Sequence, residues 1–302
     1  MKLIARMALR DGMIIGEDVY SYQNILIVKE GTIVNRQLID KLARYSIMCV
    51  AIKDSADTVL STQDKLEQST VFKQFQHTYK MNLIFFKQMM TEFFAGKSPI
   101  HTTFLLKIHD TIKSHIKYNE QLFQMLSCIK LEETDLTYAH CLNGALISHV
   151  FGSWLLLSED DIKTLTLCGF LYDIGKLKLP DSLVWKRDNL NNFEYNWLKT
   201  HTTLGYDLLK NENLNASIIK CTLEHHERCD GSGYPNNLKA SEIDRFSKYI
   251  AIVDDYLEMT SYKNINTRTL TTDDIINYFK EQGVNKYDAT TLQIILKGIS
   301  QL

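Results

Sequence analysis

The sequence predicts a mainly α-helical protein, with an all-α domain at the carboxyl end and a small α+β module in front of it. Apolar residues recur at helical spacing from about residue 61 onward. Only three prolines occur in 302 residues, which favours long helices. Short β-branched runs are confined to the first 60 residues. We therefore divide the chain into residues 1–60, 61–130 and 131–302.

The first 60 residues alternate between candidate strands and one candidate helix. Short β-branched runs bounded by glycine-containing turns are found at 12–16, 25–34 and 48–52. Between the last two, Leu38, Ile39 and Leu42 are spaced as on one helix face. This pattern predicts a small α+β module, and it contains no evident ligand constellation.

Residues 61–130 are expected to be helical, with a break at 95–99 where glycine and proline occur. Apolar residues keep a period near 3.6 on both sides of this break. The histidines at 101, 109 and 115 have no carboxylate-rich setting, so we interpret them as surface or core residues. The segment is predicted to be a connector or a homodimerisation element.

From residue 131 the helical pattern continues to the end of the chain. The expected helical segments are 133–157, 160–175, 191–210, 216–228, 245–261, 273–282 and 288–302. Because no parallel-strand signal interrupts them, this domain should be all-α.

Composition excludes several function classes. The hydrophobic content of 45% and a net charge of −2 indicate a folded protein without bulk nucleic-acid binding or attraction to an acidic membrane surface. No apolar run approaches the roughly 20 residues of a membrane helix, and the amino terminus is not a convincing signal peptide. The six cysteines are scattered, which is typical of reduced thiols in a cytoplasmic protein.

Residues 223–235 bring together two adjacent histidines, three carboxylates and a Gly-Ser-Gly-Tyr-Pro turn. Imidazole is the commonest metal ligand among side chains. Adjacent histidines on a helix point about 100° apart, so His225 and His226 could share a site only near a helix end. Gly231 and Gly233 are expected to end this helix and to permit positive φ. A solvated helix end followed by a turn is the alternative interpretation.

Two aspartates in apolar surroundings favour a metal site. Asp173 follows Cys-Gly-Phe-Leu-Tyr, and Asp254 follows Tyr-Ile-Ala-Ile-Val. A bare buried carboxylate is costly, but histidines from facing helices can share a metal ion with it. His140 and His201 lie in two further predicted helices. Nitrogen and oxygen ligands suit iron, manganese or zinc, and the absence of clustered cysteines argues against a thiolate site.

These residues also carry a family resemblance. The segments Tyr-Asp-Ile-Gly-Lys at 172–176, Leu-Lys-Thr-His-Thr-Thr-Leu-Gly-Tyr around His201, and His-His-Glu-Arg-Cys-Asp-Gly-Ser-Gly-Tyr-Pro at 225–235 resemble the HD-GYP family. This family is a branch of the HD phosphohydrolases, and the likeness covers about residues 131–302. It implies an all-α HD-type domain with two or three metal ions, usually iron or manganese. It also implies a bacterial signalling hydrolase, a phosphodiesterase that converts cyclic di-GMP to pGpG or GMP.

The resemblance implies a role for each matching residue. The implied metal ligands are His140, Asp173, His201, His225, His226 and Asp254. Within this set Asp173 would bridge two ions, with His201, His225 and His226 on one side and His140 and Asp254 on the other. Lys176 would contact the substrate phosphate. The loop tied to substrate access and partner contact comprises Asp230, Gly231, Gly233, Tyr234 and Pro235, and a diguanylate cyclase with a GGDEF domain is its candidate partner.

The chain departs from the family pattern at four places. Tyr172 replaces the histidine of the His-Asp pair, and ionising a phenol at pH 7 costs about 4 kcal/mol. We therefore expect one or two metal ions, with the second site weak or empty. Leu257 stands where a further aspartate is usual, and Lys263 to Ile265 replace an Arg-x-Tyr motif that contacts substrate. Leu136 replaces a glutamate of the members with three metals, which argues against a third ion.

Two functions stay open at this point. The first is a metal-dependent cyclic di-GMP phosphodiesterase, with activity reduced by the change at 172. The second is a catalytically inactive receptor for cyclic di-GMP, or a protein-interaction module, that keeps the fold and the loop. A third candidate function is hydrolysis of another cyclic dinucleotide or nucleotide.

Overall fold

The computed structural model describes residues 2–21, 25–53, 62–186, 189–260, 270–283 and 285–302. By its internal contacts the chain divides into two compact units, Met1–Lys73 and Gln74–Leu302. The predicted division at 60 and 130 is not tested by this split. The predicted fold class is confirmed, because helices dominate and the sheets are small two-stranded ones.

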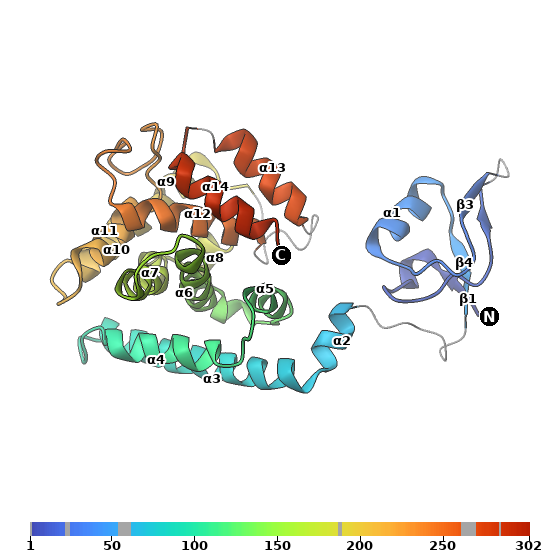
Figure 1. Ribbon diagram of the computed structural model, residues 1–302, viewed down its shortest axis with the longest axis horizontal. Coiled ribbons are helices and arrows are strands. Elements are labelled where there is room, and N and C mark those ends of the chain that lie inside the picture. Colours follow the sequence, from blue (N-terminus) through green and yellow to red (C-terminus); the bar gives the residue numbers. More distant parts are fainter. Residues whose placement is uncertain (1, 22–24, 54–61, 187–188, 261–269, 284) are drawn as a thin grey trace. The chain divides into compact units, whose positions relative to one another are not determined.

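The first unit is a small α+β module (Figure 1). Its elements are β1 Lys2–Ala5, η1 Arg6–Ala8, β2 Val19–Tyr20, β3 Leu26–Val28, α1 Arg36–Arg44, β4 Cys49–Ile52 and α2 Thr62–Gln68. Strands β1 and β4 pair antiparallel, as do β2 and β3. Helix α1 begins after Asn35, whose side chain accepts a hydrogen bond from the Leu38 N–H at 2.9 Å. Ile15, Leu42 and Ile52 lie in the core of this unit.

The structure of this unit differs from the prediction at residues 12–16 and contains a strand, β1, that was not predicted. Residues 12–16 form only isolated bridges, Ile14 to Ile33 and Ile15 to Ile52, instead of a strand. Strand β1 was not predicted, because a four-residue run is too short for its pattern to be recognised and its pairing partner β4 is distant in sequence.

The second unit is a bundle of helices. Its elements are α3 Thr70–Phe94, which crosses the boundary between the units, α4 Thr102–Lys113, α5 Asn119–Ser127, η3 Glu133–Asp135, α6 Leu136–Trp154, α7 Glu159–Leu171, η4 Ile174–Lys178, α8 Asp181–Val184, α9 Asn192–Lys199, α10 His201–Leu209, α11 Ala216–Glu224, α12 Arg245–Thr260, α13 Thr272–Gln282 and α14 Ala289–Ile299. Among the described residues, no helix combines the length and the apolarity needed to cross a membrane.

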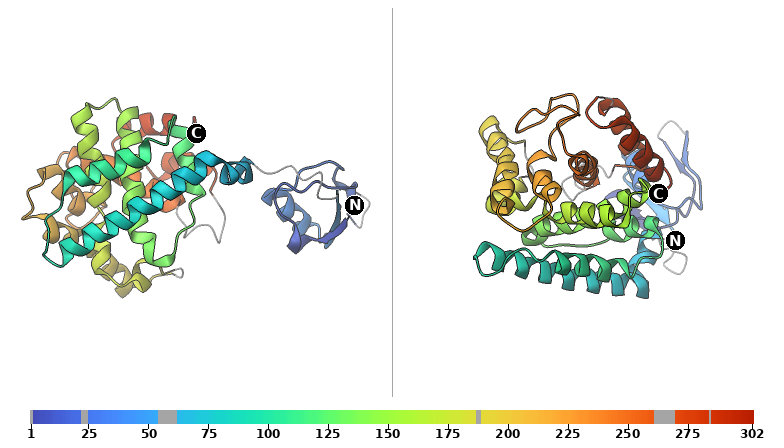
Figure 2. Two further views of the ribbon diagram at one scale, coloured as in Figure 1. Left: turned by 90° about the horizontal axis from the view of Figure 1, so that it is seen from below. Right: turned by 60° about the vertical axis from the view of Figure 1, so that its left-hand side comes forward.

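Helices α6 and α7 form the centre of this unit, and α3 and α4 form a layer against them (Figures 1 and 2). Phe86 on α3 packs against Tyr138 on α6 and Phe170 on α7. Helices α6 and α7 cross closely because Gly144 and Gly169 face each other: a Cβ on Gly144 would lie 2.6 Å from the Gly169 carbonyl oxygen.

Two helix boundaries near the candidate site were predicted wrongly. Residues 191–210 form two helices, α9 and α10, with the break at Thr200, where the Thr200 hydroxyl donates to the Trp197 carbonyl. Helix α11 ends at Glu224, so Gly231 and Gly233 do not end it. Both breaks place histidines at helix ends, where their side chains turn inward.

Candidate metal centre

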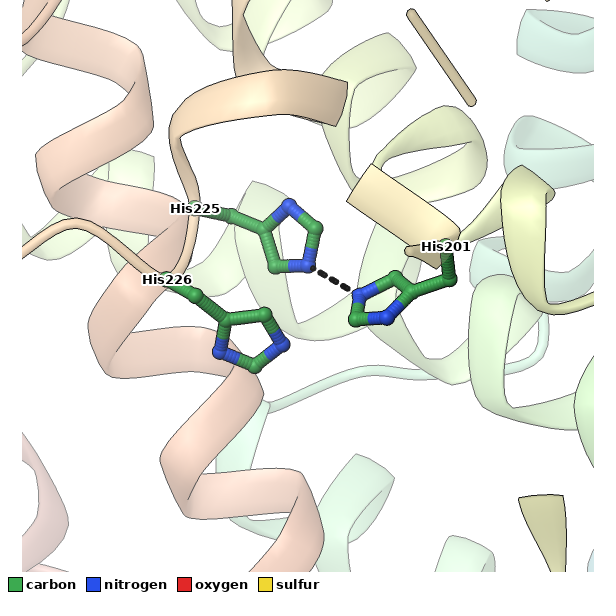
Figure 3. A group of neighbouring side chains, drawn as sticks. All are labelled: His201, His225 and His226. Carbon is green, nitrogen blue, oxygen red and sulfur yellow. Dashed lines mark hydrogen bonds between the residues drawn. The ribbon is translucent and has the colours of Figure 1, made fainter. Parts of the chain in front are cut away.

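Three histidines meet where α10 begins and α11 ends (Figure 3). His201 is the first residue of α10, His225 follows the last residue of α11, and His226 comes next. One ring nitrogen of each lies within 4.8 Å of the others. The adjacent pair can therefore share a site, as expected for histidines at a helix end.

Backbone carbonyls orient two of these rings. His201 Nδ1 donates to the Leu198 carbonyl at 2.7 Å, and His225 Nδ1 donates to the Cys221 carbonyl at 2.9 Å. Because each Nδ1 donates to a carbonyl, Nε2 is the nitrogen that each ring can offer to a ligand. The two Nε2 atoms lie only 3.1 Å apart and face each other. Two opposed lone pairs at this distance repel unless a cation or a proton lies between them.

Asp173 lies between this group and the rest of the site. It is fully buried between α7 and η4. Its Oδ1 is 3.3 Å from His201 Nε2 and 3.5 Å from His225 Nε2. Its Oδ2 is 3.1 Å from His140 Nε2 and 2.6 Å from the Lys176 ammonium nitrogen. A single carboxylate therefore reaches both halves of the site.

The charges of this core follow from burial and mutual contact. Burial alone would raise the pKa of Asp173, but Lys176 and the surrounding histidines outweigh it and hold the pKa well below its usual range. Burial lowers the pKa of His201 to about 3, so this ring is neutral at pH 7. Burial also acts to lower the pKa of His140, but the Asp173 and Asp254 carboxylates beside it raise that pKa to about 9.

A second group consists of His140 on α6 and Asp254 and Glu258 on α12, with ligand atoms within 4.8 Å of one another. Sequence analysis missed Glu258, although residues four apart on a helix share a face and the spacing from Asp254 could have indicated it. Leu257, which replaces the expected aspartate, is buried in the core instead. His226 Nδ1 approaches this group at 3.6 Å from Asp254 Oδ2.

Tyr172 is fully buried beside the second group, and its hydroxyl oxygen lies 2.7 Å from His140 Nε2. Burial raises the pKa of Tyr172 well above 10, and the charges of Asp254 and Asp173 act in the same direction. The phenol therefore stays protonated, and its hydroxyl is hydrogen-bonded to the same His140 nitrogen that faces Asp173 and Asp254. The ring fits against the close helix crossing, because a Cβ on Gly144 would lie 2.8 Å from Tyr172 Cε1.

The carboxylate oxygens provide a test of whether a metal fits. All four oxygens of Asp173 and Asp254 are buried, and within the described residues the Lys176 ammonium group, 2.6 Å from Asp173 Oδ2, is their closest polar partner. Buried carboxylates without hydrogen-bond partners are costly unless cations neutralise them. With the histidine nitrogens, they form a donor set that suits iron, manganese or zinc. These residues fit divalent metal ions.

The loop that follows the histidine pair is held against the site. Tyr234 stacks on the His226 ring, with centroids 4.7 Å apart. The buried Glu227 carboxylate accepts hydrogen bonds from the N–H groups of Asn236 at 2.6 Å and Leu238 at 2.9 Å. Gly233 leaves no room for a side chain, because a Cβ would overlap the backbone of residues 226–228.

A cavity of about 360 Å³ opens onto both groups. Its lining includes the aromatic side chains of Trp185, Tyr195 and Tyr234 and the cationic side chains of Lys176, Arg228 and Lys286. Arg228 is held by a two-pronged contact with Asp255 at 3.1 Å. The sequence assigned no role to Trp185, Tyr195 or Lys286, because no motif or spacing relates them to the histidines.

Not every predicted residue reaches this cavity. Of the predicted loop residues, Gly233 and Tyr234 line it, whereas Asp230, Gly231 and Pro235 do not. Gly231 has the expected positive φ of 81°. The segment Lys263 to Ile265 lies outside the described residues. The histidines at 101, 109 and 115 belong to neither metal-capable group of the described chain.

The chain is similar to several known proteins. A sequence model described as HD domain matches residues 120–291, more than half of the chain. The response regulator RpfG of Xanthomonas campestris, named a cyclic di-GMP phosphodiesterase, is 32% identical over 52% of this chain and 42% of its own length. A cyclic di-GMP phosphodiesterase of Thermotoga maritima is 33% identical over 49% of this chain and 42% of its own length.

A third relative, the 3'3'-cGAMP-specific phosphodiesterase 1 of Vibrio cholerae, is 28% identical over 56% of this chain and 39% of its own length. The chain thus spans about two fifths of the length of these curated relatives. Among solved structures, Bd1817, an HDG"Y"P protein from Bdellovibrio bacteriovorus, matches with a TM-score of 0.53 over 99% of both chains at 15% identity. That likeness supports the fold alone.

Proposed function

The chain belongs to the HD domain family, and from this premise we propose that it is a metal-dependent phosphodiesterase whose substrate is cyclic di-GMP. The relatives named as cyclic di-GMP phosphodiesterases support the substrate class. The proposed metal ligands are His140, Asp173, His201, His225, His226 and Asp254, and the proposed metals are iron or manganese.

One observation carries this proposal. The Nε2 atoms of His201 and His225 face each other at 3.1 Å beside the buried Oδ1 of Asp173, and each Nδ1 donates to a backbone carbonyl, which leaves Nε2 as the nitrogen that can bind a metal. A purely structural core would gain nothing from opposed lone pairs. A cation bound between these atoms removes the repulsion.

Metal ions, when bound, supply an activated water molecule and stabilise charge on the phosphate oxygens during in-line displacement. The residues of the chain bind and orient the substrate. The Lys176 ammonium group lines the cavity next to Asp173, where it can offset negative charge that develops on the phosphate. Water adds to phosphorus and one ester P–O bond breaks, so the cyclic dinucleotide opens to a linear product.

The cavity walls suit a nucleotide. Trp185 and Tyr195 offer aromatic faces on which bases can stack. Lys176 and Lys286 add positive charge to the same cavity, whereas the charge of Arg228 is paired with Asp255. This combination of stacking faces and cations is the chemistry that a dinucleotide with two phosphates requires.

We expect protein loaded anaerobically with iron or manganese to hydrolyse cyclic di-GMP, and a chelator to abolish that turnover. Chromatography of the products would separate pGpG from GMP, and 3'3'-cGAMP is the competing substrate to include because one relative is specific for it. Bound metal with no product from either dinucleotide would contradict the proposed activity. Protein that binds no metal would refute the ligand assignment.

Tyr172 favours a second candidate function, a catalytically inactive receptor for cyclic di-GMP. Its hydroxyl is hydrogen-bonded to His140 Nε2, the atom that a metal ion would use, and this competition weakens that histidine as a ligand. A receptor would bind cyclic di-GMP through the same cavity without releasing product.

Tyr172→His separates the two functions. An imidazole at 172 adds a neutral ligand, so we expect affinity for the second metal ion to rise at least about tenfold. If turnover is present before the change and increases with it, the natural protein is a weakened enzyme. Turnover that appears only in the variant identifies the natural protein as a receptor. Unchanged metal binding would place Tyr172 outside the metal centre.

A GGDEF-domain partner at the loop and homodimerisation through residues 61–130 stay predictions. Each can be measured directly, the first by binding to an isolated GGDEF domain and the second by light scattering of the full chain.

A further inference from the structure

We propose that Glu258 is a ligand of the second metal ion, together with His140 and Asp254, and that it compensates for the histidine that Tyr172 replaces. This inference rests on the proposed metal-dependent function and specifies its weaker site. None of the sequence motifs includes Glu258.

The position of Glu258 on α12 brings its carboxylate to the site. Asp254 and Glu258 are one helical turn apart and face the same side. One oxygen of each and one nitrogen of His140 lie within 4.8 Å of one another. Glu258 also lines the cavity, where its Oε1 is 3.7 Å from the Lys176 ammonium nitrogen.

Asp254 provides independent evidence for a cation at the second site. Both of its carboxylate oxygens are buried and accept no hydrogen bond within the described part of the chain. The nearest histidine nitrogens, on His140 and His226, lie 3.4 and 3.6 Å away. These distances exceed those of good hydrogen bonds but leave room for an ion that several ligand atoms approach together. With Glu258 included, the second site has four candidate protein ligands, because Asp173 Oδ2 also lies 3.1 Å from His140 Nε2.

Tyr172 then acts as a competitor for this ion. Its hydroxyl lies 2.7 Å from His140 Nε2, the atom that also faces Asp254. A metal ion has to displace that hydrogen bond before it can use the lone pair. Two ions are therefore expected, with the second bound more weakly than the ion at His201, His225 and His226.

The experiment is a titration of the metal-free full chain with Mn²⁺, followed by calorimetry and by counting bound metal after gel filtration. Wild type should bind two equivalents in two separable steps. Glu258→Gln keeps the size of the side chain but removes its charge, so we expect the second step to weaken at least about tenfold and the first to be unchanged. Glu281→Gln is the matched control, because Glu281 is exposed on α13.

Tyr172→Phe provides a second, independent measurement. Removing the hydroxyl removes the hydrogen bond that competes for His140 Nε2, so the second step should become several-fold tighter. A weaker second step in this variant would identify Tyr172, rather than Glu258, as the additional ligand and would overturn the inference.

The remaining outcomes separate this inference from the proposed function. If Glu258→Gln retains both steps with unchanged affinities, or if wild type binds a single ion, the inference is wrong and the first metal site stands. If wild type binds no metal at all, both the inference and the proposed function fail. Circular dichroism of each variant confirms that the helices are intact.

Discussion

Replacing Asp173 with asparagine is expected to remove metal from both halves of the site and to lower phosphodiesterase turnover on the order of a thousandfold. One Asp173 oxygen lies 3.1 Å from His140 Nε2, and the other lies 3.3 Å from His201 Nε2. The amide keeps the shape but loses the negative charge that both groups share. Metal counting and turnover on the same sample provide the measurement.

The same change should also destabilise the protein. Lys176 is buried with Asp173 as its closest partner, at 2.6 Å, and a buried charge that loses its partner costs about 3 kcal/mol. Asp207→Asn on α10 is the matched control, because Asp207 forms an exposed pair with Lys210 and its loss should change neither metal content nor stability. An Asp173→Asn variant that retains two ions and most of its turnover would exclude Asp173 from the metal centre.

Gly175→Ala is expected to destabilise the protein by about 3 kcal/mol or more and to disrupt the site. Gly175 packs directly on the backbone of α10, where an added Cβ would overlap the His201 carbonyl oxygen and lie 2.7 Å from the Gly205 nitrogen. Backbone atoms cannot rotate away as a flexible side chain can. The methyl group would push α10, and with it His201, away from Asp173.

Thermal unfolding measures the stability change of Gly175→Ala, and metal titration measures the damage to the site. Gly205→Ala is the matched control: its Cβ would lie 3.3 Å from Thr222 Cβ, and alanine is favoured over glycine in a helix interior. We expect that control to lose clearly less stability than Gly175→Ala, because its contacts are tight but do not overlap backbone atoms. Equal melting temperatures for the two variants would mean that η4 and α10 pack less closely than the structure indicates.

The helical fold class could be predicted from the sequence because periodic apolar residues report which face of each helix is buried. The residues at which individual helices begin and end were harder to predict. The break at Thr200, between α9 and α10, was missed because residues on both sides keep helical spacing. The end of α11 at Glu224 was missed because the prediction relied on Gly231 and Gly233 as helix-ending residues. These glycines belong to the loop that follows the histidine pair.

The candidate ligands were identifiable because histidine and aspartate in apolar surroundings need a partner, and the family motifs fixed which ones to consider. Glu258 was not identifiable in this way. On sequence it is one more charged residue near the end of a helix, and it reaches the site only because α12 crosses α6 at His140. The cavity wall formed by Trp185 and Tyr195 likewise depends on how α8 and α9 fold over the site.

The sequence by itself determined the helical class, the motif at 225–235 and the loss of a histidine at 172, since each is a property of residue type and local spacing. Tertiary structure alone decided that the Nε2 atoms of His201 and His225 face each other at 3.1 Å, that Tyr172 bonds to His140, and that His140 on α6 meets Asp254 and Glu258 on α12. The physical reason is that ligand geometry depends on how the helices cross and on which backbone carbonyl accepts a hydrogen bond from each imidazole. Local periodicity encodes neither.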